Sequence, residues 1–330
     1  MPHRTEPMPV KHWSRAGLLL TTWCNAACAS CYLACGPTRR EDMPVESAVA
    51  WWAELAAASP HGCRVHLTGG EPFGDWERLI ALCRRARAEG LTGAELVETN
   101  AFWATSEPLV RDRLRQLDQA GMGKLNISAD PYHQQFVPIE RCRLAARVGE
   151  EVLGPARVQV RWRDWLDEGF DTADLDERRR RDLFHVYLRR GRERMNGRAA
   201  GRLAGALVSM EPAAFADISC SDSLLRSRHV HLMPDGGIMP GTCAGILLGR
   251  AGNKPIAEIW RELSHDHAAR AVVGPLAAGG PLALLGEAVE HGFVPDRYAS
   301  KCHLCWEIRR HLASLHLHGD ELGPGWMYEE

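Results

Sequence analysis

The sequence lacks any run of roughly 18 consecutive apolar residues, the length that marks a membrane-spanning helix. It also lacks an excess of one charge, because 40 Lys and Arg stand against 42 Asp and Glu, for a net charge of −2. This balance argues against a general binder of nucleic acid or membranes. There is no credible export signal, and an odd count of 11 cysteines fits a closed disulfide framework poorly. We therefore expect a cytoplasmic protein whose cysteines ligate metal.

The remaining bulk properties are those of an ordinary globular protein. Hydrophobic residues make up 45% and charged residues 25% of the chain. A chain of 330 residues is long enough for two domains and for a sizeable core.

Three cysteines near the start carry the strongest signal. Cys24, Cys28 and Cys31 are spaced C-x3-C-x2-C, and Tyr32 follows directly. Three thiolates would leave one iron of a four-iron cubane cluster open to a further ligand. One alternative is a zinc knot with Cys35 as fourth ligand, although structural zinc sites usually add a second, distant cysteine pair. A lipoprotein signal ending at Cys24 is rejected, because the apolar stretch before it is too short and further cysteines follow at once.

The first 200 residues or so alternate between strand and helix patterns. We expect strands at 16–22, 64–68, 95–99, 125–128 and 157–163, a sixth strand between 186 and 205, and helices at 48–58, 76–89 and 109–120. Such a βα repeat predicts an α/β fold with a parallel sheet, either a barrel or an open doubly wound sheet.

The positions of the unusual residues favour the barrel, because loops at the carboxyl ends of barrel strands carry the chemistry. The cysteines follow the first expected strand and Gly69-Gly70-Glu71-Pro72 the second. Asn100 follows the third, Ser128-Ala129-Asp130 the fourth, and Arg161 and Arg163 end the fifth. We therefore predict a partial (β/α)6 TIM-like barrel over residues 1–205.

The cysteine spacing, Tyr32 and the Gly-Gly-Glu-Pro segment one βα unit later resemble the radical S-adenosylmethionine (radical SAM) superfamily. The resemblance implies a [4Fe–4S] cluster whose open iron chelates the amino and carboxylate groups of SAM. An electron, from a donor of the flavodoxin or ferredoxin type, then cleaves a carbon–sulfur bond. It also implies that Gly69, Gly70, Glu71 and Pro72 bind the SAM amino group, with Glu71 pairing with the ammonium.

The same resemblance gives roles to polar residues after the later strands. Asn100 and Ser128 correspond to positions that hydrogen-bond the SAM ribose or carboxylate, or else they only form strand-terminal turns. Arg161 and Arg163 can neutralise the SAM carboxylate through a bidentate fork, or else they are surface charges.

A second cysteine set lies beyond a Gly/Ala-rich stretch at 197–206, in residues 206–330. Two expected strands at 229–233 and 237–239 flank the turn-forming Asp235-Gly236, which predicts a hairpin. The set consists of Cys220, Cys243, Cys302 and Cys305, enough for one tetrahedral metal site, and zinc is a serious rival there. The arrangement resembles the small α+β auxiliary-cluster domains of the SPASM or twitch type, which implies an auxiliary [4Fe–4S] cluster on these four cysteines.

Three sequence segments resemble those of the radical SAM peptide epimerases: residues 98–103, residues 128–137 and the hairpin that ends at Pro240. In those enzymes a cysteine pair follows the hairpin proline and one member returns a hydrogen atom to the substrate. Here Pro240-Gly241-Thr242 leads to the single Cys243. We therefore hypothesise oxidation or cross-linking of a ribosomally made peptide rather than epimerisation.

Three residues of the loop at 130–133 are candidate catalytic groups, or else they only pack the loop: Asp130, Tyr132 and His133. The arginine-rich run at 178–198 reads as a helix with solvated arginines, or as a dock for an acidic leader peptide. Since only residues 1–15 precede the first strand, we expect no separate leader-binding domain. Four cysteines have no firm role, and Cys35 is close enough to the cluster loop for a redox or hydrogen-donor function: Cys35, Cys63, Cys83 and Cys142.

Two other functions stay open. Dehydrogenation of a small alcohol, such as a sugar or aminocyclitol, is the alternative within enzymes. A metal-binding scaffold or an electron carrier is the alternative outside them.

Overall fold

In the computed structural model, which describes residues 10–191 and 193–329, eight strands form one sheet in the order β5-β4-β3-β2-β1-β6-β7-β8. The strands are β1 (Arg15–Leu19), β2 (Arg64–Thr68), β3 (Val97–Thr99), β4 (Leu125–Ile127), β5 (Val158–Val160), β6 (His229–Leu232), β7 (Gly237–Pro240) and β8 (Gly249–Arg250). Strands β1–β5 run parallel to their neighbours, and β6 runs parallel to β1. The hairpin strands β7 and β8 add antiparallel pairs.

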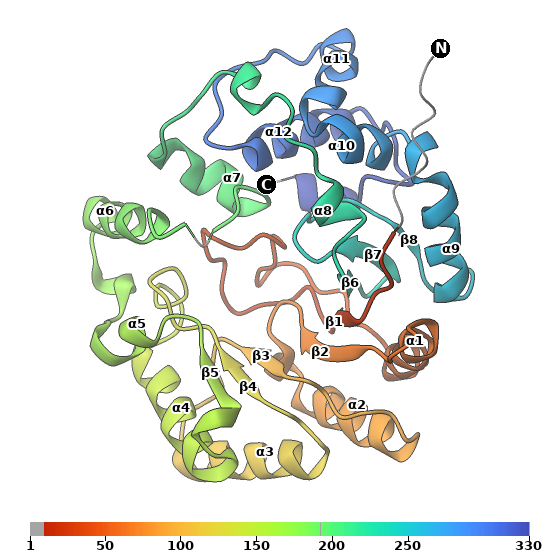
Figure 1. The fold of residues 1–330 in the computed structure, drawn as a ribbon. Helices are drawn as coiled ribbons and strands as arrows, with labels where there is room; N and C mark the ends of the chain where they lie inside the picture. Colours follow the sequence, from red (N-terminus) through yellow and green to blue (C-terminus); the bar gives the residue numbers. More distant parts are fainter. Residues whose placement is uncertain (1–9, 192, 330) are drawn as a thin grey trace.

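Helices α1–α4 connect the parallel strands and lie along one side of the sheet, as Figure 1 shows. Their bounds are α1 (Val45–Ala58), α2 (Trp76–Ala88), α3 (Glu107–Gln119) and α4 (Ile139–Leu153). Each carries an apolar stripe at helical spacing, such as Val110, Leu114 and Leu117 on α3, and these stripes are buried. The α/β class with a partial TIM-like barrel and a hairpin in the second part is therefore confirmed.

The predicted sixth strand between Val186 and Gly205 is wrong. The described residues there form the end of α6 (Glu177–Leu188), the short α7 (Arg198–Leu203) and connecting turns. The sixth parallel strand is instead β6, which is the first strand of the predicted hairpin and pairs with β1. Pairing with β1 gives its apolar residues Val230 and Leu232 a place in the core, which the Gly/Ala-rich stretch before it does not offer.

The rest of the chain is mainly helical and lies beyond the hairpin, in the blue part of Figure 1. It contains α8 (Ser221–Leu224), α9 (Ile256–Asp266), α10 (Val273–Gly279), α11 (Leu282–Glu290) and α12 (Lys301–Ser314), while α5 (Arg163–Glu168) follows β5. Since β6 and β7 extend the same sheet as β1–β5, the two halves share a sheet, and the division at residue 205 stays a prediction. Among the described residues, no helix is both long and apolar enough to cross a membrane.

Candidate functional site

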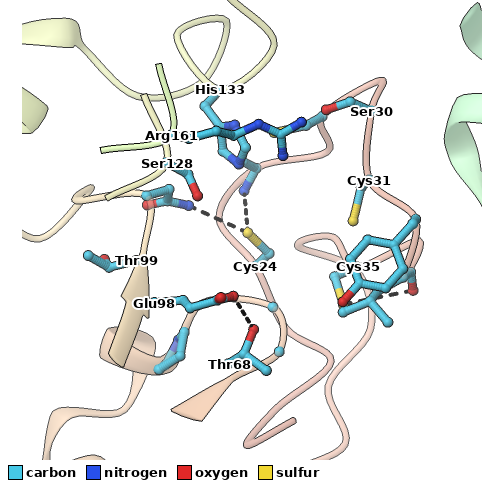
Figure 2. Close-up of a pocket in the computed structure, with 18 residues that line it drawn as sticks. Cys24, Ser30, Cys31, Cys35, Thr68, Glu98, Thr99, Ser128, His133 and Arg161 are labelled. Atoms are coloured by element: carbon cyan, nitrogen blue, oxygen red, sulfur yellow. Dashed lines mark hydrogen bonds between the residues drawn. The ribbon is translucent and has the colours of Figure 1, made fainter. Parts of the chain in front are cut away.

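The loops at the carboxyl ends of β1–β5 converge on a cavity of about 140 Å³, shown in Figure 2. Its walls come from every loop that the sequence singled out. They include the cysteine loop after β1, Gly69 and Gly70 after β2, Asn100 after β3, Ser128 after β4 and Arg161 after β5. The predicted cofactor residues that line this cavity are Tyr32, Gly69, Gly70, Pro72, Asn100, Ser128 and Arg161.

The three motif cysteines line the same cavity, and Cys35 lies there too. Cys24, Cys28 and Cys35 are buried, while Cys31 is partly exposed. The Cys24 sulfur accepts hydrogen bonds from the backbone N–H of Ala26 at 3.4 Å and from Asn100 Nδ2 at 3.6 Å (Figure 2). Such donors stabilise a thiolate, although burial and the charges of Glu71 and Cys28 raise the pKa of the metal-free Cys24.

Cys31 has the opposite electrostatic surroundings. A hydrogen bond from Cys35 and the nearby Arg198 guanidinium lower the pKa of Cys31 to about 6, against the effect of burial. Cys35 thus lies beside the motif, within reach of Cys31. Because a thiolate is the form that ligates iron, the lowered pKa of Cys31 favours this cysteine as a ligand.

One arginine from α7 holds the cysteine loop in place. The buried Arg198 side chain donates to the carbonyl oxygens of Cys28 at 3.2 Å, Ala34 at 3.1 Å and Cys35 at 3.1 Å. Its backbone N–H also donates to the carbonyl of Cys31 at 3.0 Å. A loop without regular structure needs such donors, because its buried carbonyls have no strand or helix partner.

The two glycines after β2 let their loop touch the cysteine loop. A Cβ atom at Gly70 would lie 1.9 Å from the carbonyl oxygen of Trp23, and Gly69 has φ +128°. The N–H of Gly70 donates to the carbonyl of Thr21 at 2.7 Å. Only glycine permits this approach, and it places the backbone of both loops at one cavity.

Glu71 does not line the cavity. Its carboxylate is buried and accepts hydrogen bonds from the N–H of Asn100 at 2.7 Å, from Thr99 Oγ1 at 2.8 Å and from the N–H of Phe73 at 3.1 Å. Burial raises the pKa of Glu71 to about 7 against the effect of those donors. The structure therefore shows Glu71 tying the loop after β2 to the loop after β3, and its predicted contact with the SAM ammonium stays a prediction.

Of the three candidate catalytic residues, only His133 lines the cavity. Asp130 is fully buried and its Oδ2 lies 2.8 Å from His133 Nδ1. Burial opposes a charge on His133, but the Asp130 carboxylate and the Cys28 thiolate outweigh it and raise the pKa of His133 well above its usual range. Arg161 Nε lies 3.4 Å from the same Asp130 carboxylate. Asp130 thus orients two cationic side chains at the cavity.

Tyr132 and Arg163 lie elsewhere. Tyr132 is fully buried and its hydroxyl donates to the carbonyl of Phe184 at 3.2 Å, so it packs the loop against α6. Arg163 begins α5 and forms an ion pair with Glu150 of α4, away from the cavity. The structure brings neither side chain to the predicted site.

A second, larger cavity of about 600 Å³ adjoins the first, since both are lined by Ser30, Tyr32, Glu98, Ser128 and Arg161. Its walls are polar and carry both charges, and they reach to the hairpin strand β6 and the segment after β7. The further lining residues include Arg15, His66, Asn126, Glu193, Arg194, His229, His231 and Thr242. Arg161 crosses between the two cavities and donates to Glu193 Oε1 at 2.7 Å.

The four cysteines of the second set come from separate elements that meet. Cys220 precedes α8, Cys243 follows β7, and Cys302 and Cys305 are one turn apart on α12. Burial raises the pKa of Cys220 to about 12, and Cys305, Cys243 and Cys302 add to this rise. The buried Arg309 donates to Cys305 Sγ at 3.3 Å, which supplies a positive charge beside the thiols. Four thiols are enough for a four-thiolate metal site, and a cluster on these cysteines stays a prediction.

Several site residues were not predicted from the sequence. Arg198 ends the arginine-rich run at 178–198, for which we expected solvated arginines or a peptide dock, and the tertiary fold places it against the cysteine loop. Glu98 lines both cavities, and burial raises its pKa. A charged residue in the middle of a buried strand was the signal that could have identified it, because such a residue needs a polar interior.

Comparisons with known proteins agree with the cysteine motif. Residues 14–138 match a family model described as a 4Fe–4S single cluster domain. A search of the curated proteins gives no match. Among solved structures, BtrN in complex with AdoMet and 2-DOIA is 17% identical, over 79% of this chain and 91% of that one, with a TM-score of 0.45.

Two further solved structures are similar at the same low level. SuiB of Streptococcus suis, bound to S-adenosylmethionine, is 14% identical over 88% of this chain and 77% of its own, with a TM-score of 0.36. Native anSMEcpe with bound AdoMet and Cp18Cys peptide is 14% identical over 79% of this chain and 83% of its own, with a TM-score of 0.43. At these values the likeness identifies no individual residue and no substrate.

All three solved structures are described as complexes with AdoMet or S-adenosylmethionine. The family model confirms an iron–sulfur cofactor for the first part of the chain. Residues 14–138 of the chain thus match a 4Fe–4S single cluster domain.

Proposed function

We propose that this protein is a radical SAM enzyme that cleaves SAM reductively and abstracts hydrogen from a substrate. One observation carries the proposal. The three thiols of the C-x3-C-x2-C loop line a cavity together with Gly69, Gly70, Asn100, Ser128 and Arg161, and that cavity opens into a larger polar one. A cofactor pocket beside a substrate pocket is the arrangement that radical transfer requires.

The donor set fits a cluster with one open iron. Cys24, Cys28 and Cys31 would hold it, and hydrogen bonds to Cys24 and the lowered pKa of Cys31 favour thiolates. When bound, the cluster and SAM together supply a one-electron reduction that yields a 5′-deoxyadenosyl radical.

The protein's own groups bind and orient the nucleotide. The backbone of Gly69 and Gly70 offers peptide groups at the cavity wall without a side chain in the way. Asn100 and Ser128 offer hydrogen bonds, and Arg161 offers a guanidinium to a carboxylate. Arg161 is itself held by Asp130 and Glu193, so its position is fixed before the ligand arrives.

His133 is the group placed to move a proton at the cavity. The buried Asp130 holds its Nδ1 and favours the imidazolium form. An imidazolium at this wall can donate a hydrogen bond or a proton to a bound group.

The electron donor is an acidic protein of the flavodoxin or ferredoxin type. A surface hollow beside the cysteine loop is lined by Ala27 and Ala29 of that loop and by Arg202 and Arg310. These cationic side chains would attract an acidic partner to the place nearest the cluster. Arg202→Glu should slow turnover with flavodoxin and leave turnover with dithionite unchanged.

The favoured substrate is a ribosomally made peptide, on the basis of the phrases shared with peptide epimerases. A small alcohol is the second candidate, favoured by the larger cavity, because about 600 Å³ falls within the range of small-molecule sites. Formation of 5′-deoxyadenosine with a precursor peptide, but not with sugars or aminocyclitols, would support the peptide.

We propose oxidation or cross-linking rather than epimerisation. Thr242 lines the larger cavity, whereas the single Cys243 is grouped with the second cysteine set. A cluster held by Cys220, Cys243, Cys302 and Cys305 would supply an acceptor for the electron of the substrate radical. Clean incorporation of one deuterium from deuterated buffer, with the substrate mass otherwise unchanged, would refute this.

Metal analysis tests the alternative outside enzymes. Anaerobically reconstituted protein should contain about eight irons per chain, as two cubane clusters require. Zinc without iron would indicate a scaffold instead.

A further inference from the structure

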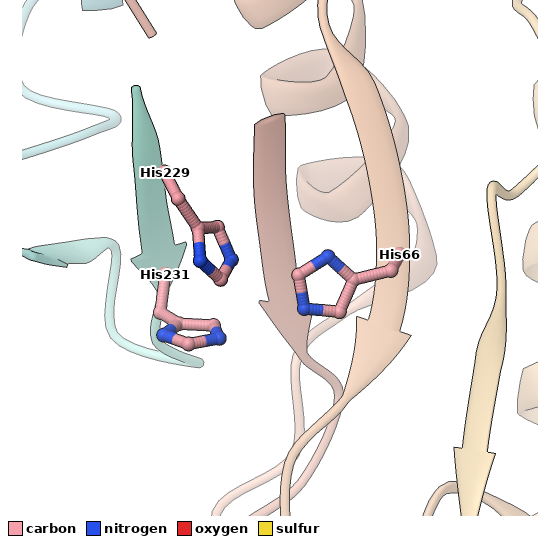
Figure 3. Close-up of side chains that lie close together, drawn as sticks. All are labelled: His66, His229 and His231. Atoms are coloured by element: carbon pink, nitrogen blue, oxygen red, sulfur yellow. The ribbon is translucent and has the colours of Figure 1, made fainter. Parts of the chain in front are cut away.

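Three histidines of the larger cavity form a cluster to which the radical SAM proposal assigns no role. His66 lies on β2, and His229 and His231 lie on β6, on either side of β1 (Figure 3). One ring nitrogen from each can be chosen so that all three lie within 4.8 Å of one another. We propose that these three imidazoles bind a divalent transition-metal ion, with a fourth coordination position open to the cavity.

The strand register builds this cluster. Gly17 of β1 pairs with His66 on one side and with His231 on the other. His229 and His231 are two residues apart on one strand, so they share a face. A Cβ atom at Gly17 would lie 2.2 Å from His231 Cδ2 and 2.6 Å from His66 Nε2. The missing side chain at Gly17 therefore makes the space in which the rings meet.

Each ring has one buried nitrogen that no other group in the described part of the chain satisfies. Three buried nitrogens, His66 Nδ1, His229 Nε2 and His231 Nδ1, have no hydrogen-bond partner among the described residues. Buried polar atoms normally find a partner, so the cluster lacks something that would satisfy them. His66 and His231 are 2% and 4% exposed, which leaves little water to do so.

The protonation state also suits a metal. Burial lowers the pKa of His66 to about 3 and that of His229 to about 4, and Arg15 acts in the same direction. The rings are therefore neutral at pH 7, and neutral imidazole is the ligand form. Arg15 is a cation whose charge acts on all three rings, and that charge is offset by Glu95, whose Oε2 lies 2.7 Å from Arg15 Nε.

The spacing is close to that of a metal centre. Zn–N bonds of about 2.0–2.1 Å at tetrahedral angles put the nitrogens about 3.4 Å apart. The ring nitrogens lie within 4.8 Å of one another, so each distance between them must shorten by about 1.4 Å at most. Side-chain rotation can supply this, because one side of the cluster faces the cavity. Three histidines with a fourth open position are the ligand set of catalytic zinc sites, where water or substrate completes the shell.

The test uses Zn²⁺ and the cluster-loaded protein, and zinc binding is measured directly, so it does not depend on the proposed radical chemistry. We expect one Zn²⁺ per chain, with a zinc-edge X-ray absorption shell of nitrogen or oxygen at about 2.0–2.1 Å. His231→Gln and His229→Gln should each weaken the binding at least about tenfold. The exposed His61→Gln is the matched control and should bind as the parent does.

Two results would overturn the proposal. One is a shell of sulfur at about 2.3 Å, which would place the zinc on cysteines. The other is equal Zn²⁺ affinity in both histidine variants and the parent, which would make the cluster a packing feature or a wall that binds substrate through hydrogen bonds. His229 is only half-buried, so its variant keeps the test valid if His231→Gln fails to fold.

Discussion

Replacing Arg198 with Met should release the cysteine loop. The side chain donates to the buried carbonyls of Cys28, Ala34 and Cys35, and methionine keeps its apolar length while removing every donor. A buried carbonyl left without a donor costs about 1–3 kcal/mol. Taking the lower end for each of the three bonds gives about 3 kcal/mol for the closed loop.

That free energy raises the open population of the loop about a hundredfold. Because a chelator takes iron from the open loop, the visible absorbance of the first cluster should bleach about a hundredfold faster in the variant. The assay is a time course with an iron chelator under anaerobic conditions. Arg198→Lys keeps the charge but cannot reach three carbonyls, so its bleaching rate should fall between those of the parent and Arg198→Met.

Arg202→Met is the matched control, because Arg202 is exposed on the same helix and carries the same charge. It should bleach at the parent rate. If Arg198→Met also bleached at the parent rate, the loop would be held by something other than this side chain, and the reasoning would be refuted.

Three further predictions concern other parts of the site. Cys35→Ser should keep the iron and visible absorbance of the first cluster while Cys24→Ser loses them; equal loss in both would make Cys35 a fourth thiolate ligand and leave no iron open to SAM. Asp130→Asn removes the carboxylate that holds His133, and it should lower product formation roughly 100-fold while SAM is still cleaved without product. Chromatography of 5′-deoxyadenosine and of the product measures the two yields. An unchanged product yield would show that His133 has no acid–base role. Burial lowers the pKa of His231 well below 6.5, so the unfolded chain binds its proton first as the pH falls. Its contribution to stability is therefore present above pH 6.5 and lost below it. Urea unfolding of the metal-free protein should show stability falling from about pH 7.5 to about pH 5, and less so in His231→Phe; parallel profiles would contradict this.

The first half of the fold could be predicted because its signals are local. Arg64–Thr68 reads as a short strand before two glycines, and it is strand β2 with the same bounds. Leu125 and Ile127 alternate with polar residues and form β4. Since parallel strands end at one edge, the residues after them could be placed together without knowing any distance.

The sequence could not predict what depends on pairing between distant segments. His66 and His231 are brought together because β6 pairs with β1, and nothing in either strand encodes that neighbour. The same limit applies to Arg198, which reaches the cysteine loop across the fold. Glu71 was expected to face a ligand, but its backbone-directed contacts depend on the loop after β3.

The central claim is that three thiols and one open iron cleave SAM. The most direct measurement is 5′-deoxyadenosine formation by the anaerobic, cluster-loaded and chemically reduced protein. We predict that it forms with the parent and with the matched control Cys63→Ala, a buried cysteine away from the cavity, and that it is absent in Cys24→Ala, Cys28→Ala and Cys31→Ala. No 5′-deoxyadenosine from the parent, or undiminished formation by the three variants, would contradict the claim.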